Sequence, residues 1–134
     1  MCCGTFDLLH LGHLDYFRQA KKFGDHLIVV IARDKTKKDQ QKNILFNEEE
    51  RRKLVQSLKI VDEAVLGNYD DHFIIIQDKR PDVICLGYDH PIDELELKKK
   101  LAQLNLYPEI KRMNAYKPEI YKSSKIKEVL FCLP

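Results

Sequence analysis

HLIVVIAR, residues 26–33, is a short apolar run rich in valine and isoleucine, and it decides the fold class. Two similar runs follow, EAVLG at 63–67 and DVICLG at 82–87, each ending near a glycine, aspartate or arginine. Runs that are apolar on both faces are typical of strands buried in a parallel sheet. The segments between them have helical periodicity and are long enough for the crossover helices that parallel strands require. The pattern therefore predicts a doubly wound α/β sheet.

Helices and a late strand are expected around these runs. Helices are predicted at 11–23, from 47, within 70–80, at 93–104 and from 123 onward, and a strand at 107–113. In the helix from Asn47, a capping box with Glu50 marks the start, and Leu54, Val55 and Leu58 supply the buried face. The polar stretch 34–43 is predicted to be a loop. The result is a five-stranded, Rossmann-like parallel sheet with helices on both faces.

The first strand of this sheet is the exception to the pattern. Only Met1, Cys2 and Cys3 precede Gly4, where the central strand is expected, and a strand normally has about five residues. Either this strand is very short, or the sequence lacks a few N-terminal residues.

Length and composition restrict the class of protein. A chain of 134 residues fits one domain, 1–134. The net charge of +2, from 23 Lys+Arg against 21 Asp+Glu, gives no case for a nucleic-acid partner, so an anionic partner is expected to be small. No apolar run has the length of a membrane span, and no targeting peptide is visible. The cysteines, Cys2, Cys3, Cys85 and Cys132, have neither metal-ligand nor disulfide-framework spacing, which favours a reduced, cytoplasmic setting.

GTFDLLHLGH, residues 4–13, has the residues of an anion site. A strand, a glycine-containing turn and a helix N-terminus present free backbone N–H groups to a phosphate. His10 and His13, three residues apart, would project to one side, and Gly12 lets a phosphate approach the backbone. The spacing is that of neither G-x-x-x-x-G-K-[ST] nor G-x-G-x-x-G. Two alternatives remain open. The histidines could have a purely structural role, or they could bind a metal, for which no convincing third ligand is present.

The same stretch resembles the G-x-F-D-x-x-H-x-G-H motif of the cytidylyltransferase-like nucleotidyltransferase superfamily at every defined position. The matching residues are Gly4, Phe6, Asp7, His10, Gly12 and His13. The resemblance covers essentially the whole chain and implies the nucleotidyltransferase type of HUP fold. It also implies an enzyme that transfers a nucleoside monophosphate from a nucleoside triphosphate to a phosphorylated acceptor, by direct in-line attack on the α-phosphate.

The resemblance also implies site residues. His10 and His13 would donate to the α-phosphate. Two further residues complete the implied catalytic set, Lys42 as a mobile lysine and Arg52 as the arginine of an E-x-x-R-like helix. The nucleotide-binding residues implied are Gly4, Thr5, Phe6, Gly12, His13, Gly87, Asp89, Ser123 and Ser124, and the acceptor-binding ones are Asp7, Asp34 and Lys117.

Some of these residues also have plain structural readings. Ser123 and Ser124 could also serve as helix caps, and Asp7 could serve to order its loop. Lys35, Lys37 and Lys38 are interpreted as solvated loop charges.

Four further stretches, ARDKT, EEERRKLV, LGYDHPIDE and LNLYPEIKR, are similar to those of archaeal-type FAD synthetases. That resemblance implies transfer of AMP from ATP to FMN, with Mg²⁺ brought by the triphosphate and a homodimer as a possible assembly. Two alternatives stay open. One is transfer from CTP or ATP to a small acceptor such as glycerol 3-phosphate, heptose 1-phosphate or phosphoethanolamine, and the other is a non-catalytic nucleotide-binding module.

Overall fold

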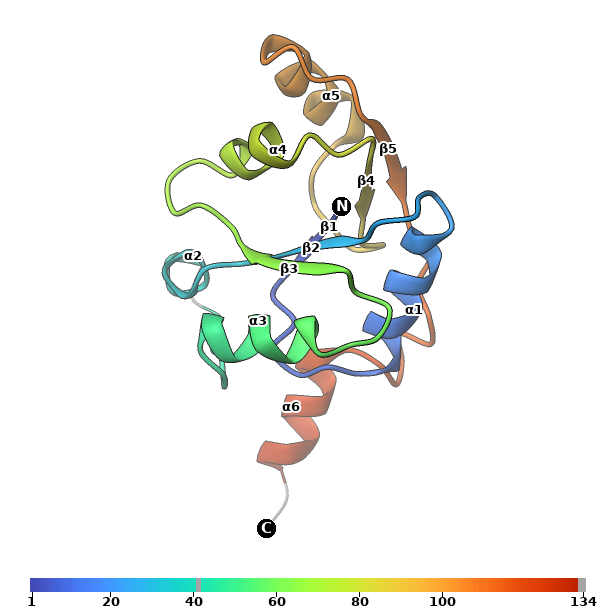
Figure 1. Ribbon diagram of the computed structural model, residues 1–134. Coiled ribbons are helices and arrows are strands. Elements are labelled where there is room, and N and C mark those ends of the chain that lie inside the picture. The colour runs from blue at the N-terminus through green and yellow to red at the C-terminus, as the bar shows by residue number, and fades with distance from the viewer. Residues whose placement is uncertain (41, 133–134) are drawn as a thin grey trace.

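The computed structural model describes residues 1–40 and 42–132, which form one α/β unit (Figure 1). Its elements in chain order are β1 (Cys2–Gly4), α1 (Leu11–Lys21), β2 (Ile28–Ile31), α2 (Asp34–Asp39), α3 (Glu48–Gln56), β3 (Glu63–Leu66), α4 (Phe73–Lys79), β4 (Val83–Leu86), α5 (Glu94–Gln103), β5 (Glu109–Arg112) and α6 (Ser123–Phe131). Strands and crossover helices alternate as the apolar runs predict.

The five strands form one parallel sheet in the order β3-β2-β1-β4-β5, which confirms the doubly wound fold. The central strand β1 has only three residues, yet it pairs on both sides, through Gly4 with Ile31 and through Cys2 with Cys85. The amino group of Met1 extends this pairing by donating to the carbonyl oxygen of Val83 at 2.7 Å. A short strand is therefore sufficient to seat the motif that follows it.

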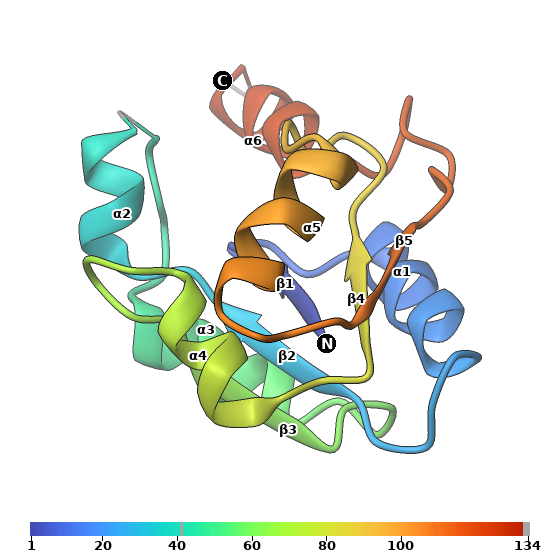
Figure 2. The same cartoon turned by 90° about the horizontal axis from the view of Figure 1, so that it is seen from above.

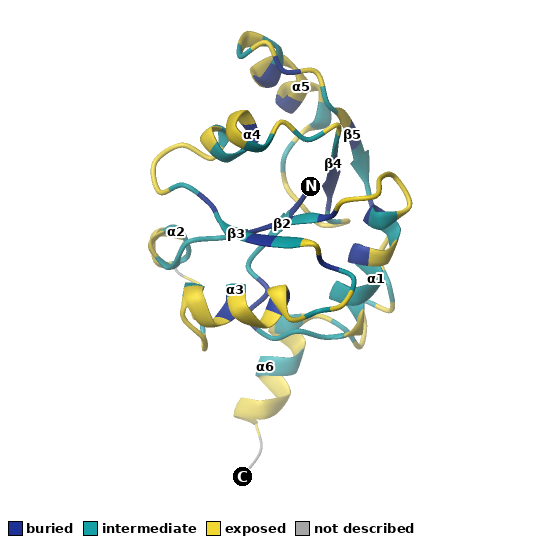
Figure 3. Cartoon of the chain, viewed as in Figure 1, coloured by how far each residue is buried: buried dark blue, intermediate teal, exposed yellow. Residues whose placement is uncertain are grey.

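Helices cover both faces of the sheet, with α1 and α3 on one side and α4 and α5 on the other (Figures 1 and 2). Side chains of β2 alternate between the two cores, because successive residues of a strand point to opposite faces. Val29 and Ile31 pack with Phe17 of α1 and Val55 of α3, whereas Val30 packs with residues of α4 and α5. Figure 3 shows buried segments both on the strands and on the helices that cover them.

Two expectations for the region after β2 were wrong. Residues 34–39 form helix α2 rather than a loop, although they carry no apolar periodicity. Val55 of α3 is fully buried and Leu58, which lies just beyond the end of α3, is partly buried. The residue Leu54 is 46% exposed because it lies outside the helix face that meets the sheet.

The strand order fixes where a ligand binds. From β1 the chain passes to β2 and then β3 on one side, and afterwards to β4 on the other side of β1. Open α/β sheets bind ligands at the carboxyl ends of the strands, beside such a switch point. Residues that follow Gly4, Ile31, Leu66 and Leu86 all reach this edge, so the motif 4–13 starts where a ligand is expected. Among the described residues, no helix is long and apolar enough to cross a membrane.

Candidate active site

His10 and His13 lie face to face at the start of α1. Their ring centroids are 3.7 Å apart with an angle of 19° between the planes. The backbone N–H of His10 donates to Nδ1 of His13 at 3.3 Å. Because Nδ1 accepts this bond, the neutral His13 ring carries its proton on Nε2, ready to donate. Nδ1 of His10 is buried without a hydrogen-bond partner among the described residues. The two imidazoles thus form one paired unit.

Two glycines of the motif are required by close contacts. A Cβ on Gly12 would lie 2.9 Å from the His10 ring and 3.2 Å from Cβ of Tyr121. A Cβ on Gly4 would lie 2.6 Å from the ring of Phe6. Phe6 has a left-handed backbone, with φ of 52°, and its buried ring meets His13 edge to face at 5.2 Å. Both glycines therefore let aromatic rings pack closely around the histidine pair.

Asp7 is buried and bonds to the loop before α3. Its carboxylate accepts from the backbone N–H groups of Leu45 at 2.8 Å and Phe46 at 2.9 Å, and from Nζ of Lys127 at 2.5 Å. Burial opposes the charge of Asp7, but Lys127 and the two N–H groups outweigh it and lower the pKa of the carboxyl group. Two roles are predicted for Asp7, namely ordering its loop and binding the acceptor. The geometry favours the first.

Lys127 of α6 also contacts the motif, although no sequence pattern predicts it. Besides Asp7, its Nζ donates to the carbonyl oxygen of Asn43 at 2.8 Å. It thereby joins the last helix to the motif 4–13 and to the loop before α3.

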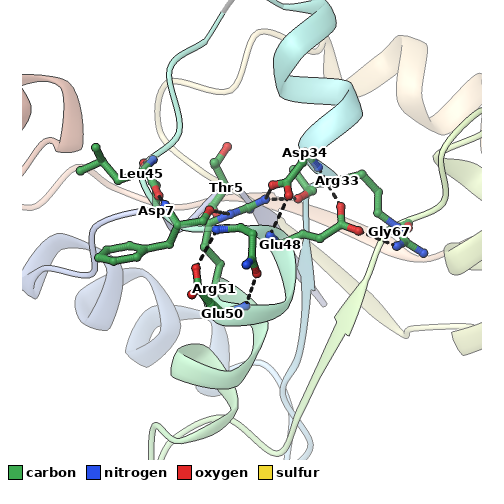
Figure 4. Close-up of polar contacts among 12 residues, drawn as sticks. Thr5, Asp7, Arg33, Asp34, Leu45, Glu48, Glu50, Arg51 and Gly67 are labelled. Carbon is green, nitrogen blue, oxygen red and sulfur yellow. Dashed lines mark hydrogen bonds and ion pairs between the residues drawn. The ribbon is translucent and has the colours of Figure 1, made fainter.

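Arg51 of α3 is fully buried and holds four segments together (Figure 4). Its guanidinium donates to the carbonyl oxygens of Thr5 at 2.7 Å, Ala32 at 2.9 Å and Phe46 at 3.0 Å, and to Oδ1 of Asp34 at 2.6 Å. The ends of β1 and β2 are thus tied to the start of α3.

Arg52, the arginine predicted for the site, lies outside this buried network. Its guanidinium pairs with Glu49 on the outer surface of α3, and its side chain is 28% exposed. Helical phase explains this difference, because Arg51 precedes buried Val55 by four residues and so shares its face. The arginine that enters the network at the strand ends is Arg51, and a catalytic role for Arg52 stays a prediction.

The N-terminus of α6 approaches the motif from the far end of the chain. Oγ of Ser123 donates to the carbonyl oxygen of Leu8 at 3.2 Å, while Ser124 lies exposed in the first turn. The ring of Tyr121 lies nearly parallel to that of His10, at 6.3 Å. Lys117 has a left-handed backbone and its Nζ lies 5.6 Å from the centre of the Tyr116 ring. Free N–H groups of a helix N-terminus thus lie beside the histidine pair.

The loop after β4 carries the other predicted nucleotide residues. Arg112 of β5, which the sequence analysis did not identify, supports this loop by donating to the carbonyl oxygens of Gly87 at 3.1 Å, His90 at 2.9 Å and Ile92 at 2.8 Å. The Asp89 carboxylate lies 3.9 Å from Nζ of Lys122. The loop is therefore held at the switch point.

Lys37 and Lys42 form a local positive charge near Arg51. Burial, followed by the charges of Lys42 and Arg51, lowers the pKa of Lys37. Lys37 lies in helix α2 rather than in a loop and is half-buried, with its Nζ donating to Oε1 of Gln40 at 3.1 Å, and it joins Lys42 as a candidate phosphate ligand. In the described ranges 1–40 and 42–132, no group of three His, Cys, Asp or Glu side chains could hold a metal ion.

The pKa of His13 predicts a loss of stability in acid. Burial, and secondarily the neighbouring His10, lower this pKa from 6.5 to about 3. Between these values the unfolded chain binds a proton at this position and the folded protein does not. The free energy of unfolding therefore rises with pH through this window. The contribution of His13 reaches its full value above about pH 6.5. We expect it to fall by about 2 kcal/mol between pH 7 and pH 5 through His13 alone.

Urea denaturation at pH 5 to 7 of the native protein and of His13→Gln measures this effect. The variant should show a shallower fall, and equal slopes would contradict the prediction. Asp7 does not interfere, because its lowered pKa keeps its contribution to stability intact at pH 5 to 7 and places the loss of that contribution below the ordinary value of 3.8.

Comparison with known proteins identifies the family of the chain. The cytidylyltransferase-like family model matches residues 1–129, so the chain belongs to this family. The FAD synthase of Picrophilus torridus is 46% identical over 127 residues, 95% of this chain and 91% of that protein. The FAD synthase of Archaeoglobus fulgidus is 46% identical over 113 residues, 84% of this chain and 82% of that protein. A crystal structure of the lipopolysaccharide core biosynthesis protein from Thermoplasma volcanium matches with a TM-score of 0.86 and 43% identity, covering 87% of this chain and 96% of that one.

Proposed function

We propose that this protein is an FMN adenylyltransferase, which transfers AMP from ATP to FMN and yields FAD and pyrophosphate. The observation that carries the proposal is the identity of 46% to an FAD synthase over 95% of the chain. The paired histidines beside the α6 N-terminus support it, because nucleotidyl transfer needs donors fixed around one phosphoryl group.

The chemistry follows from this geometry. A phosphate oxygen of FMN attacks the α-phosphorus of ATP in line, and the bond to the β-phosphate oxygen breaks, so pyrophosphate leaves with its electron pair. Charge spreads over the phosphoryl oxygens in the transition state. His10 and His13 donate to these oxygens, and because Nδ1 of His13 is occupied by a backbone N–H, its donor is Nε2. Mg²⁺ bound to the triphosphate would offset the charge of the leaving group.

The remaining residues orient the nucleotide. Backbone N–H groups at the start of α6, together with Ser123 and Ser124, support binding of the β- and γ-phosphates. Lys37 and Lys42 supply positive charge from the side of α2. Asp89 is proposed to accept from a ribose hydroxyl at the carboxyl end of β4.

A panel of substrates tests the proposal. The protein is incubated with Mg²⁺, with ATP or CTP, and with FMN, glycerol 3-phosphate or heptose 1-phosphate. Pyrophosphate and the nucleotidyl product are then measured. We expect FAD and pyrophosphate from ATP and FMN, and loss of both when EDTA removes Mg²⁺. Pyrophosphate in no combination would favour a non-catalytic nucleotide-binding module.

Transfer to a sugar phosphate is the second candidate function. The structural match to a lipopolysaccharide core biosynthesis protein favours it, since the chains are 43% identical. A nucleotidyl sugar from heptose 1-phosphate, with no FAD from FMN, would establish this candidate and overturn the first.

A further inference from the structure

We propose that Arg33, Asn68 and Tyr69 form the site that binds the isoalloxazine ring of the acceptor. This inference rests on the proposed function and names the part of the protein that would select a flavin. Arg33 follows β2, and Asn68 and Tyr69 follow β3, so all three lie at the carboxyl edge of the sheet, on the side of β1 away from β4. The nucleotide is assigned to the switch point between β1 and β4, which leaves this side for the acceptor.

The guanidinium of Arg33 is held in place by hydrogen bonds and still has N–H groups that can donate to a ligand. Its Nε donates to the carbonyl oxygen of Gly67 at 2.6 Å, and its Nη1 donates to Glu48 at 3.0 Å (Figure 4). Nη2 has no hydrogen-bond partner within residues 1–40 and 42–132. The pair with Glu48 offsets the charge of Arg33, so the site suits a neutral polar ring better than a phosphate.

Asn68 supplies an acceptor that the protein does not use. Its Oδ1 is buried and has no partner among the described residues. A buried carbonyl oxygen without a hydrogen bond is unfavourable, and nearly all such groups in folded proteins are paired. A ligand N–H would satisfy it.

Tyr69 offers an aromatic face beside these polar groups. Its ring lies 4.3 Å from the guanidinium carbon of Arg33, and the residue is 49% exposed. The cation fixes one face of the ring, and the exposed part is available for stacking.

The three groups match the chemistry of a flavin. The pyrimidine edge of isoalloxazine presents a carbonyl, an N–H and a second carbonyl in a row. Nη2 of Arg33 can donate to one carbonyl, the Asn68 amide can accept from the N–H and donate to the other carbonyl, and Tyr69 can stack on the ring. A glycerol phosphate offers neither the ring nor the N–H.

The spacing of the strands also fits. The ladder continues past the strand ends, because Ala32 donates to Gly4 and Gly67 donates to Ile31, each at 2.9 Å. β3 lies two strands from β1, about 10 Å away. An extended ribityl chain covers a similar distance between the phosphate and the ring. Asp34, whose side chain is 43% exposed, follows the intervening strand β2 and can accept from ribityl hydroxyls.

The test compares FMN with an FMN methylated at N3, which lacks the donor for Asn68. With the native protein and saturating ATP, we expect the KM for the methylated flavin to be about tenfold higher than for FMN. Asn68→Ala should raise the KM for FMN about tenfold and abolish the difference between the two flavins. Tyr69→Ala should raise the KM for FMN about tenfold and reduce the quenching of flavin fluorescence on binding, whereas Tyr69→Phe should behave as the native protein.

The controls separate this site from the proposed function. Tyr107→Ala removes a tyrosine that is 79% exposed beyond α5 and should leave both KM values unchanged. The KM for ATP should stay within about twofold in every variant. If the native protein makes no FAD, the proposed function fails. If FAD forms but the methylated flavin and both alanine variants match native FMN kinetics, this site assignment is overturned.

Discussion

His13→Ala is expected to lower kcat for nucleotidyl transfer by about 10²–10³-fold, while the KM for ATP changes by only a few fold. The imidazole is fixed between the His10 ring and the edge of Phe6, with its Nδ1 held by a backbone N–H. A donor placed in this way reaches the α-phosphate without reorganisation, and it contributes most when charge develops in the transition state. Its loss should therefore appear in kcat rather than in substrate binding.

Steady-state pyrophosphate release measures this effect, with His26→Ala as the matched control. The His26 side chain is 58% exposed and lies just before β2, at the opposite end of the sheet from the site. The control should keep native kinetics. A His13→Ala protein that is folded and turns over at the native rate would show that the paired imidazoles do not act on the phosphate.

Arg51→Met is expected to lower the free energy of unfolding by about 3–5 kcal/mol. The variant leaves the carbonyl oxygens of Thr5, Ala32 and Phe46 without their donor, and Asp34 without its cation. Arg51→Lys should recover only part of the loss, since an ammonium cannot reach four acceptors on different segments.

Arg52→Met is the matched control, because it removes the neighbouring arginine of the same helix. Within residues 1–40 and 42–132, Arg52 pairs only with exposed Glu49, so its removal should change the free energy of unfolding by less than about 1 kcal/mol. Urea denaturation at pH 7 compares the two variants. Equal losses would mean that the buried network does not hold the site edge together.

Local patterns in the sequence predict the fold well because each element carries its own signal. Apolar runs rich in valine and isoleucine mark β2 and β4, and the Asn47 capping box marks the start of α3. Helix α2 has no such signal, because Asp34–Asp39 is polar throughout. Its presence depends on tertiary contacts such as those of Asp34 with Arg51 and Glu48.

The site could be predicted only where its residues are adjacent in the chain. The histidine motif is local, so the sequence alone predicts that His10 and His13 lie together, and helical phase with Val55 indicates that Arg51 rather than Arg52 is the buried arginine. Lys127 could not be found in this way, because its partner Asp7 lies 120 residues away. Asn68 also carries no signal in the sequence, because only the folded structure shows that its side-chain oxygen has no hydrogen-bond partner among the described residues.

The contacts of Lys127 with Asp7 and of Ser123 with Leu8 have a consequence for how the protein folds. They close loops of 120 and 115 residues, nearly the whole chain. The entropic penalty of closing a loop grows with its length, so contacts of this kind form late, after local helices and neighbouring strands have assembled. Helix α6 should therefore dock last. A folding intermediate would form its sheet before it could bind a triphosphate.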